Sequence, residues 1–279
     1  MGKSQSGDGD IPFDLSIELL KRLHILTRDG QLNQDSRRKL KQVNHLVQFI
    51  GPLLQEMQGE GQEVTLVDHG AGKSYLGFIL YDRFFRRQAP AGRVFAIESR
   101  AELVESSRRL AAELGFAALT PLCLSVAEAS ASALLPERVD MVTALHACDT
   151  ATDDAIRFAL LKSARHVVLV PCCQAEVAEH LRRHKADLLA RDAIAEIWRH
   201  PLHTREFASL LTNALRCLQL EAHGYQVSVT ELVGWEHSLK NELIIARRKG
   251  QPQRRAAERL AALLDTFALG ELRERFFTP

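Results

Sequence analysis

The 279-residue sequence lacks several features that would place it in a class at once. No apolar run approaches 18 residues, so we expect no membrane span. The polar first ten residues predict neither a signal peptide nor a lipid anchor. The cysteines number five, and two of them are adjacent, which does not suit a disulfide framework. These absences favour a cytoplasmic, reducing location.

An excess of charge of one sign is also missing. The 36 basic and 35 acidic residues give a formal net charge of +1, which argues neither for nor against a nucleic-acid partner. Local basic clusters exist, but aromatic residues are not interleaved with them, so each also fits a solvated surface. The clusters are Arg83/Arg86/Arg87, Arg182/Arg183/Lys185, Arg247/Arg248/Lys249 and Arg254/Arg255.

Apolar periodicity predicts two helices first and then strands that alternate with helices. The first helices are expected over 13–27 and 35–57, and a final helix over 251–276. The predicted strands are 64–68, 93–98, 119–124, 139–147, 166–173, 225–234 and 241–248. Alternation of strands and helices indicates an α/β fold with a parallel, doubly wound sheet, and the last two strands should pair as a hairpin.

The loop after the first predicted strand contains Gly-Ala-Gly-Lys-Ser but does not fit a phosphate-binding loop. That pattern requires a glycine at position 67, which is Val67. The dinucleotide pattern requires a small residue at position 75, which is Tyr75. What remains is an acid-x-Gly-x-Gly motif formed by Asp68, Gly70 and Gly72. Ligands of doubly wound sheets bind at this carboxyl edge of the strands.

The residue types at this edge suit a particular ligand. Glycines let the backbone approach a ligand closely, and the following helix N-terminus favours a carboxylate. Asp68 can accept a hydrogen bond from an ammonium group, and Glu98, at the end of the next predicted strand, suits ribose hydroxyls. An amino-acid head and a ribose together describe S-adenosyl-L-methionine. Ser125 and Val126, after the third predicted strand, are expected to contact the adenine through the backbone.

Three motifs resemble those of one protein family. They are Asp68–Leu76, "LHACDTATD" at Leu145–Asp153, and Pro171-Cys172-Cys173. Over about residues 40–250 the sequence resembles class I S-adenosylmethionine-dependent methyltransferases, and among them the methyltransferase-like proteins of the twenty-five type and the tRNA acceptor-stem 2′-O-methyltransferases. Gln174 stands where those tRNA enzymes have a histidine.

The resemblance implies a Rossmann-like seven-stranded sheet with an N-terminal helical extension. We expect a tail and helices over 1–60, the S-adenosylmethionine-binding domain over 61–250 and a C-terminal helix over 251–279. The implied activity is methyl transfer to an oxygen or nitrogen of RNA, with tRNA or rRNA as substrate. A small-molecule or protein methyltransferase and a non-catalytic RNA-binding module are the alternatives. The sequence leaves the acceptor and the oligomeric state open.

The candidate catalytic residues follow the fourth and fifth predicted strands. His146 or Asp149 is expected to manage the proton that the acceptor loses, although Asp149 also fits a helix cap. Asp153 reads as a cap or a partner of the helix dipole.

Three roles remain open for Cys172 and Cys173. They line the acceptor pocket, act as a transient nucleophile, or bind a metal with Cys148 and His146. Adjacent cysteines suit zinc poorly, so we expect no metal. Lys73 is expected to meet the donor carboxylate or an acceptor phosphate, and Gln42 and His45 to face the substrate.

Overall fold

The computed structural model describes residues 15–27, 29–32, 34–86, 92–145, 147, 149–171, 174–184, 196–197, 199–232 and 242–277. The chain forms two compact units, Met1–Ser125 with Glu231–Asn241 and Val126–Thr230 with Glu242–Pro279, which we call unit 1 and unit 2. Each unit is described by itself. Within the described residues, no helix combines the length and the apolar character that crossing a bilayer requires.

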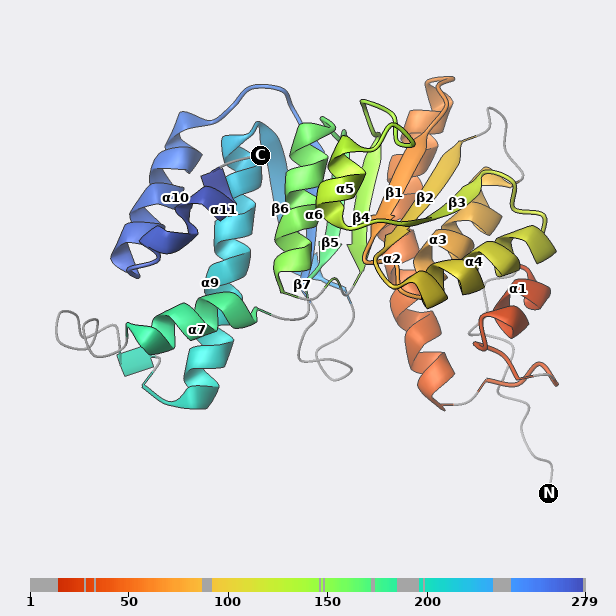
Figure 1. The fold of residues 1–279 in the computed structure, drawn as a ribbon, viewed down its shortest axis with the longest axis horizontal. Helices are drawn as coiled ribbons and strands as arrows, with labels where there is room; N and C mark the ends of the chain where they lie inside the picture. The colour runs from red at the N-terminus through yellow and green to blue at the C-terminus, as the bar shows by residue number, and fades with distance from the viewer. Residues whose placement is uncertain are drawn as a thin grey trace. The chain divides into compact units, whose positions relative to one another are not determined.

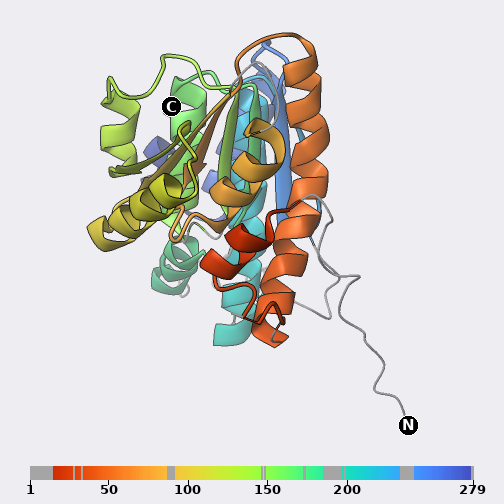
Figure 2. The ribbon, with the colours of Figure 1, turned by 90° about the vertical axis from the view of Figure 1, so that its right-hand side faces the viewer.

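Unit 1 begins with two helices and continues as alternating strands and helices (Figures 1 and 2). The long helix α2 is drawn in orange in both figures. In chain order the elements are α1 (Ile17–Arg22), α2 (Gln34–Gly59), β1 (Thr65–His69), α3 (Tyr75–Leu80), the π-helix η1 (Tyr81–Phe85), β2 (Arg93–Glu98), α4 (Ala101–Glu113) and β3 (Leu119–Cys123).

Unit 2 contains the remaining strands and the C-terminal helices (Figure 1). The elements are α5 (Val126–Ala131), β4 (Met141–Leu145), α6 (Thr150–Leu161), β5 (His166–Val170), α7 (Ala175–Arg183), α9 (Pro201–Ala222), β6 (Tyr225–Glu231), β7 (Glu242–Arg248), α10 (Arg254–Thr266), the short 3-10 helix η3 (Gly270–Leu272) and α11 (Arg273–Phe277).

The sheet has seven strands in the order β3-β2-β1-β4-β5-β7-β6. β1 pairs parallel with β2, β2 with β3, and β4 with β5, whereas β7 runs antiparallel to β5. The predicted adjacency of the last two strands is confirmed, and so is the α/β, Rossmann-like fold with an N-terminal helical region. All the predicted strands form, with their ends shifted by at most a few residues.

The core of unit 1 includes an apolar stripe along α2. Its apolar side chains at steps of three and four are buried: Leu40, Val43, Val47, Ile50, Leu54 and Met57. Asp82 anchors the chain that leads into α1, because its carboxylate accepts hydrogen bonds from the Ser16 N–H at 2.9 Å and from Arg86 at 3.1 Å. This buried acid of the π-helix therefore holds α1 against unit 1.

The start of α4 is organised by Glu98. The N-cap residue is Arg100, which makes no side-chain capping bond. The Glu98 carboxylate accepts hydrogen bonds from the Ser99 hydroxyl at 3.4 Å and from the Arg100 N–H at 3.1 Å.

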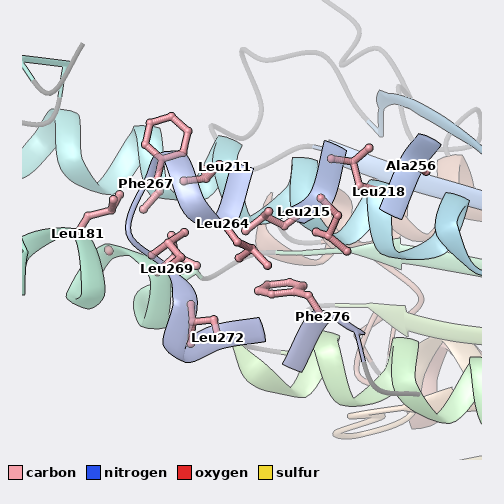
Figure 3. Close-up of a cluster of buried hydrophobic side chains, with 14 residues drawn as sticks. Leu181, Leu211, Leu215, Leu218, Ala256, Leu264, Phe267, Leu269, Leu272 and Phe276 are labelled. Atoms are coloured by element: carbon pink, nitrogen blue, oxygen red, sulfur yellow. The ribbon is translucent and has the colours of Figure 1, made fainter. Parts of the chain in front are cut away.

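Unit 2 has an apolar cluster built by α7, α9 and the C-terminal segment (Figure 3). Leu215, Leu260, Leu264 and Phe276 are each fully buried in it. The expected single C-terminal helix is wrong in detail, because the chain turns at Ala268, with φ of 52°, and continues as η3 and α11. The turn lets Phe276 fold back into the cluster.

A buried ion pair joins α6 to α9 within unit 2. The Arg216 guanidinium, fully buried, donates to both carboxylate oxygens of Asp153 at 2.7 and 2.9 Å. It also donates to the Asn213 side chain and to the Asp149 carbonyl. Asn213 in turn donates to Glu242 at the start of β7, at 2.7 Å. One arginine thus ties the turn after β4, two helices and the last strand together.

Removing one partner of this pair should destabilise the protein strongly. We expect Asp153→Ala to lower the free energy of unfolding by about 3–5 kcal/mol, because the Arg216 charge stays buried without its carboxylate. Urea denaturation measures the difference. The control is Arg254→Ala, which removes an arginine that is 93% exposed and paired with Glu258; its effect should stay within about 1 kcal/mol. Similar losses in both variants would contradict a special role for the buried pair.

Candidate functional site

The two predicted ligand-binding acids lie at one edge of unit 1. β1 and β2 are parallel, and His69 is in register with Ile97, so Glu98 lies one residue beyond the end of β1. Asp68 and Glu98 are only 2% and 7% exposed. The register therefore brings the two carboxylates to the same carboxyl edge, as the sequence predicts.

The glycine loop is fastened to β2 by its backbone. Gly70 and Gly72 have φ of 62° and 57°, a left-handed conformation that glycine adopts without steric cost. The Ala71 N–H donates to the Ile97 carbonyl at 3.0 Å, and the Gly72 N–H donates to the Glu98 carboxylate at 2.9 Å. The loop is therefore held at the end of the neighbouring strand by the acid expected to bind ribose.

Glu98 is surrounded by donors that favour its charged form. Burial by itself would raise the pKa of Glu98. Hydrogen bonds from the Arg100 side chain and the backbone N–H groups of Arg100 and Gly72, with the charge of Arg100, outweigh burial and lower the pKa to about 2. The Arg100 Nε lies 3.0 Å from one carboxylate oxygen and its Nη2 lies 3.1 Å from the other.

Sequence reasoning missed two residues here. Arg100 follows Glu98 by two positions in the sequence, and this spacing could have indicated an ion pair between them. Gly77 is the other, because a Cβ at this position would lie 2.6 Å from the Ser74 Oγ and 3.9 Å from an Asp68 carboxylate oxygen. A glycine in the first turn of α3 lets the helix approach the loop and the acid closely.

Three further residues are predicted to contact S-adenosylmethionine. Lys73 and Ser125 are exposed, and Val126 is the first residue of α5. His69, next to Asp68, is fully buried, and burial lowers the pKa of its imidazole to about 3. At neutral pH this ring is uncharged, so it does not neutralise the neighbouring carboxylate.

Asp149, in unit 2, lies in the turn after β4 in an unusual conformation. Its φ of 49° and ψ of −122° are rare for a residue with a side chain. Its carboxylate accepts from the N–H of Ala175 at 2.8 Å and of Glu176 at 3.3 Å. Asp149 therefore caps α7, rather than the following helix α6.

The other predicted catalytic residues, His146, Cys172 and Cys173, lie outside the described residues. Their neighbour Gln174 is buried, and its side-chain oxygen accepts a hydrogen bond from Ser209 at 2.8 Å. Gln174 is the N-cap of α7 but makes no side-chain capping bond, because Asp149 supplies the acceptor from the neighbouring turn. Asp153, read as a cap, is the partner of Arg216.

The lowered pKa of Glu98 predicts a pH-dependent contribution to stability. A carboxyl group whose folded pKa lies below its unfolded value of 4.5 stabilises the fold above that value. The contribution is lost as pH falls toward about 2. We expect wild type to exceed Glu98→Gln in urea midpoint at pH 7, and the difference to shrink below pH 4.5. A difference that persists unchanged at the lowest pH would contradict this assignment.

Comparison with known proteins supports one family. A family model described as "Methyltransferase domain" matches residues 38–180, more than half of the chain. No curated protein sequence matches.

Three solved structures show a weak likeness to this chain. One is the magnesium protoporphyrin IX methyltransferase ChlM from Synechocystis PCC 6803 with bound SAM, with 12% identity and a TM-score of 0.44, covering 86% of this chain and 100% of that one. Another is the Methanococcus jannaschii fibrillarin pre-rRNA processing protein, with 13% identity and a TM-score of 0.43, covering 68% of each chain. The third is M. capricolum TrmK in complex with S-adenosyl-homocysteine, with 8% identity and a TM-score of 0.42, covering 69% and 65%.

Likenesses at these levels do not define a substrate. The match to the family model covers β1, the glycine loop and Glu98, which are the elements on which the sequence prediction rests. The chain therefore belongs to this methyltransferase family, which confirms the prediction of an S-adenosylmethionine-dependent methyltransferase.

Proposed function

We propose that the protein transfers a methyl group from S-adenosylmethionine to an oxygen or nitrogen of RNA. The assignment of S-adenosylmethionine as the methyl donor rests on the glycine loop. Its Gly72 N–H donates a hydrogen bond to the buried Glu98 carboxylate at 2.9 Å. Asp68, Gly70 and Gly72 hold the methionine end, and Glu98 holds the ribose. Ser125 and Val126 contact the adenine.

Arg100 regulates access to Glu98 in this proposal. It now binds the carboxylate through Nε and Nη2, so both carboxylate oxygens already have partners. The Arg100 side chain is 60% exposed, and turning it into solvent frees acceptor positions on Glu98 for two ribose hydroxyls. The Gly72 bond can stay in place while this exchange occurs.

The RNA part rests on basic side chains of unit 1, of which Arg37, Lys41 and Lys73 are exposed. Arg37, Lys41 and His45 recur at steps of four along α2, which places them on one helix face. Arg37 and Lys41 are exposed, and the His45 Nδ1 lies 2.8 Å from the Leu232 carbonyl. Lys73 adds an exposed cation directly after the donor loop. A polyanion is a ligand that such a stripe attracts.

The bound donor supplies an electrophilic methyl group on a sulfonium, so the protein mainly aligns the acceptor and manages one proton. Asp149 or His146 would take the proton that the acceptor loses on methylation. Cys172 and Cys173 follow β5 in the sequence, where we place them as walls of the acceptor site.

The RNA assignment predicts a cation effect that depends on position. Lys73→Ala should reduce tritiated-methyl transfer into total RNA by about tenfold while the protein still binds S-adenosylmethionine in calorimetry. Lys249→Ala is the matched control. Lys249 is exposed and follows β7, which pairs antiparallel with β5. It therefore lies near the first residue of β5, at the end opposite the carboxyl end of that strand. Methyl incorporation that survives nuclease treatment of the substrate pool would favour a protein or small-molecule acceptor.

Two variants of Asp149 separate its proton role from its capping role. Asp149→Asn keeps an oxygen that accepts from Ala175 and Glu176 but removes the base, whereas Asp149→Ala removes both. We expect Asp149→Asn to retain the thermal midpoint of wild type and to lose at least about 100-fold in methyl-transfer rate. Full activity of the asparagine variant, with loss confined to alanine, would make Asp149 purely structural.

A further inference from the structure

A cluster of potential metal ligands lies within unit 2, on α7 and η3. His180 and His184 are four residues apart, one helical turn, and Glu271 comes from η3. One donor atom from each residue lies within 4.8 Å of the other two. The His180 Nδ1 and a Glu271 carboxylate oxygen are 3.4 Å apart.

The second observation that points to a ligand is the buried imidazole of His180. The residue is 6% exposed, and its Nδ1 is buried without a hydrogen-bond partner in the described part of the chain. A buried polar nitrogen left without a partner costs free energy. A Glu271 carboxylate oxygen lies 3.4 Å from this nitrogen, but the two make no hydrogen bond. An imidazole nitrogen and a carboxylate therefore lie close together without satisfying each other.

We propose that His180, His184 and Glu271 bind a divalent transition-metal ion, with zinc as the preferred one. Two imidazoles and a carboxylate form a ligand set that zinc uses, at about 2.0–2.2 Å from each donor atom. In a tetrahedral site such bonds place neighbouring donor atoms roughly 3.3 Å apart, close to the 3.4 Å between His180 and Glu271. The half-buried His184 and the exposed Glu271 have room to adjust.

Arg183 is the group that the metal must displace. Its Nη2 lies 3.5 Å from the His180 Nε2, and its Nη1 lies 3.8 Å from the Glu271 carboxylate. The side chain is 52% exposed and also reaches Glu179, so it can withdraw into solvent. Glu176 and Glu274 line the same cavity together with Arg157 and Arg275, and Glu176 is paired with Arg275. Arg183 therefore acts as an internal competitor for the metal position.

The bound ion would fasten the C-terminal segment to α7. An ion pair between Arg275 of α11 and Glu176 of α7, at 2.7 Å, already joins these elements. The apolar cluster of Figure 3 covers the same helices. A metal that binds only the folded chain adds stability that increases with the logarithm of its concentration once this exceeds Kd. This role is structural, and it does not depend on the acceptor proposed above.

Calorimetric titration of zinc into the chelator-treated full chain tests the proposal. We expect binding that raises the thermal midpoint, and a loss of at least about tenfold in affinity for His184→Ala and for Glu271→Gln. Both residues are accessible, so these variants should fold. Glu274→Gln, an exposed acid of the same cavity wall, is the matched control and should bind as wild type does. Equal affinity in wild type, His184→Ala and Glu271→Gln overturns the proposal.

Two further readouts make the assignment specific. Arg183→Ala should bind zinc at least as tightly as wild type, because a competing charge is removed, and a loss like that of His184→Ala would contradict the proposed competition. Cobalt substituted for zinc should give ligand-field bands without a thiolate charge-transfer band. A thiolate band that His184→Ala leaves unchanged would assign the metal to cysteines and overturn the histidine site.

Discussion

The buried pair of Arg216 and Asp153 is the interaction on which unit 2 depends most. A guanidinium that is fully buried must satisfy its donors inside the protein, and this one does so on a carboxylate, an amide and a backbone carbonyl. The carbonyl belongs to Asp149, so the turn at the end of β4 is fixed by a side chain that lies 67 residues later. The geometry of a candidate catalytic turn is thereby linked to the packing of α9.

In unit 1 the corresponding buried charge is the carboxylate of Glu98. Glu98 accepts hydrogen bonds from the backbone N–H groups of Gly72 and Arg100, so it fixes both the glycine loop and the start of α4. In each unit a charged group is buried, and its surroundings are arranged by its need for partners. These two groups position the glycine loop and the turn after β4, to which the proposal assigns donor binding and proton transfer.

The strands and the position of the glycine loop could be predicted because both leave local signals in the sequence. Apolar runs mark buried strands, and the Asp68–Gly70–Gly72 spacing excludes other nucleotide loops. The sequence did not predict Arg216, because nothing local relates an arginine in a helix to Asp153 more than 60 residues earlier. The break at Ala268 was also missed, since the apolar spacing of 251–276 continues through it and only the backbone φ reveals the turn.

The conformation of Asp149 has a consequence for how this turn is built. Its φ of 49° and ψ of −122° cost a side-chain-bearing residue roughly 1–3 kcal/mol, whereas glycine would adopt them freely. Glycine would, however, remove the oxygen that accepts from Ala175 and Glu176. The chain thus keeps a carboxylate in a position that its backbone disfavours, and the strain is opposed by bonds from Arg216 and α7. A substitution that relaxes this turn would remove the backbone strain. It would also remove the hydrogen bonds by which Asp149 connects the turn after β4 to α7.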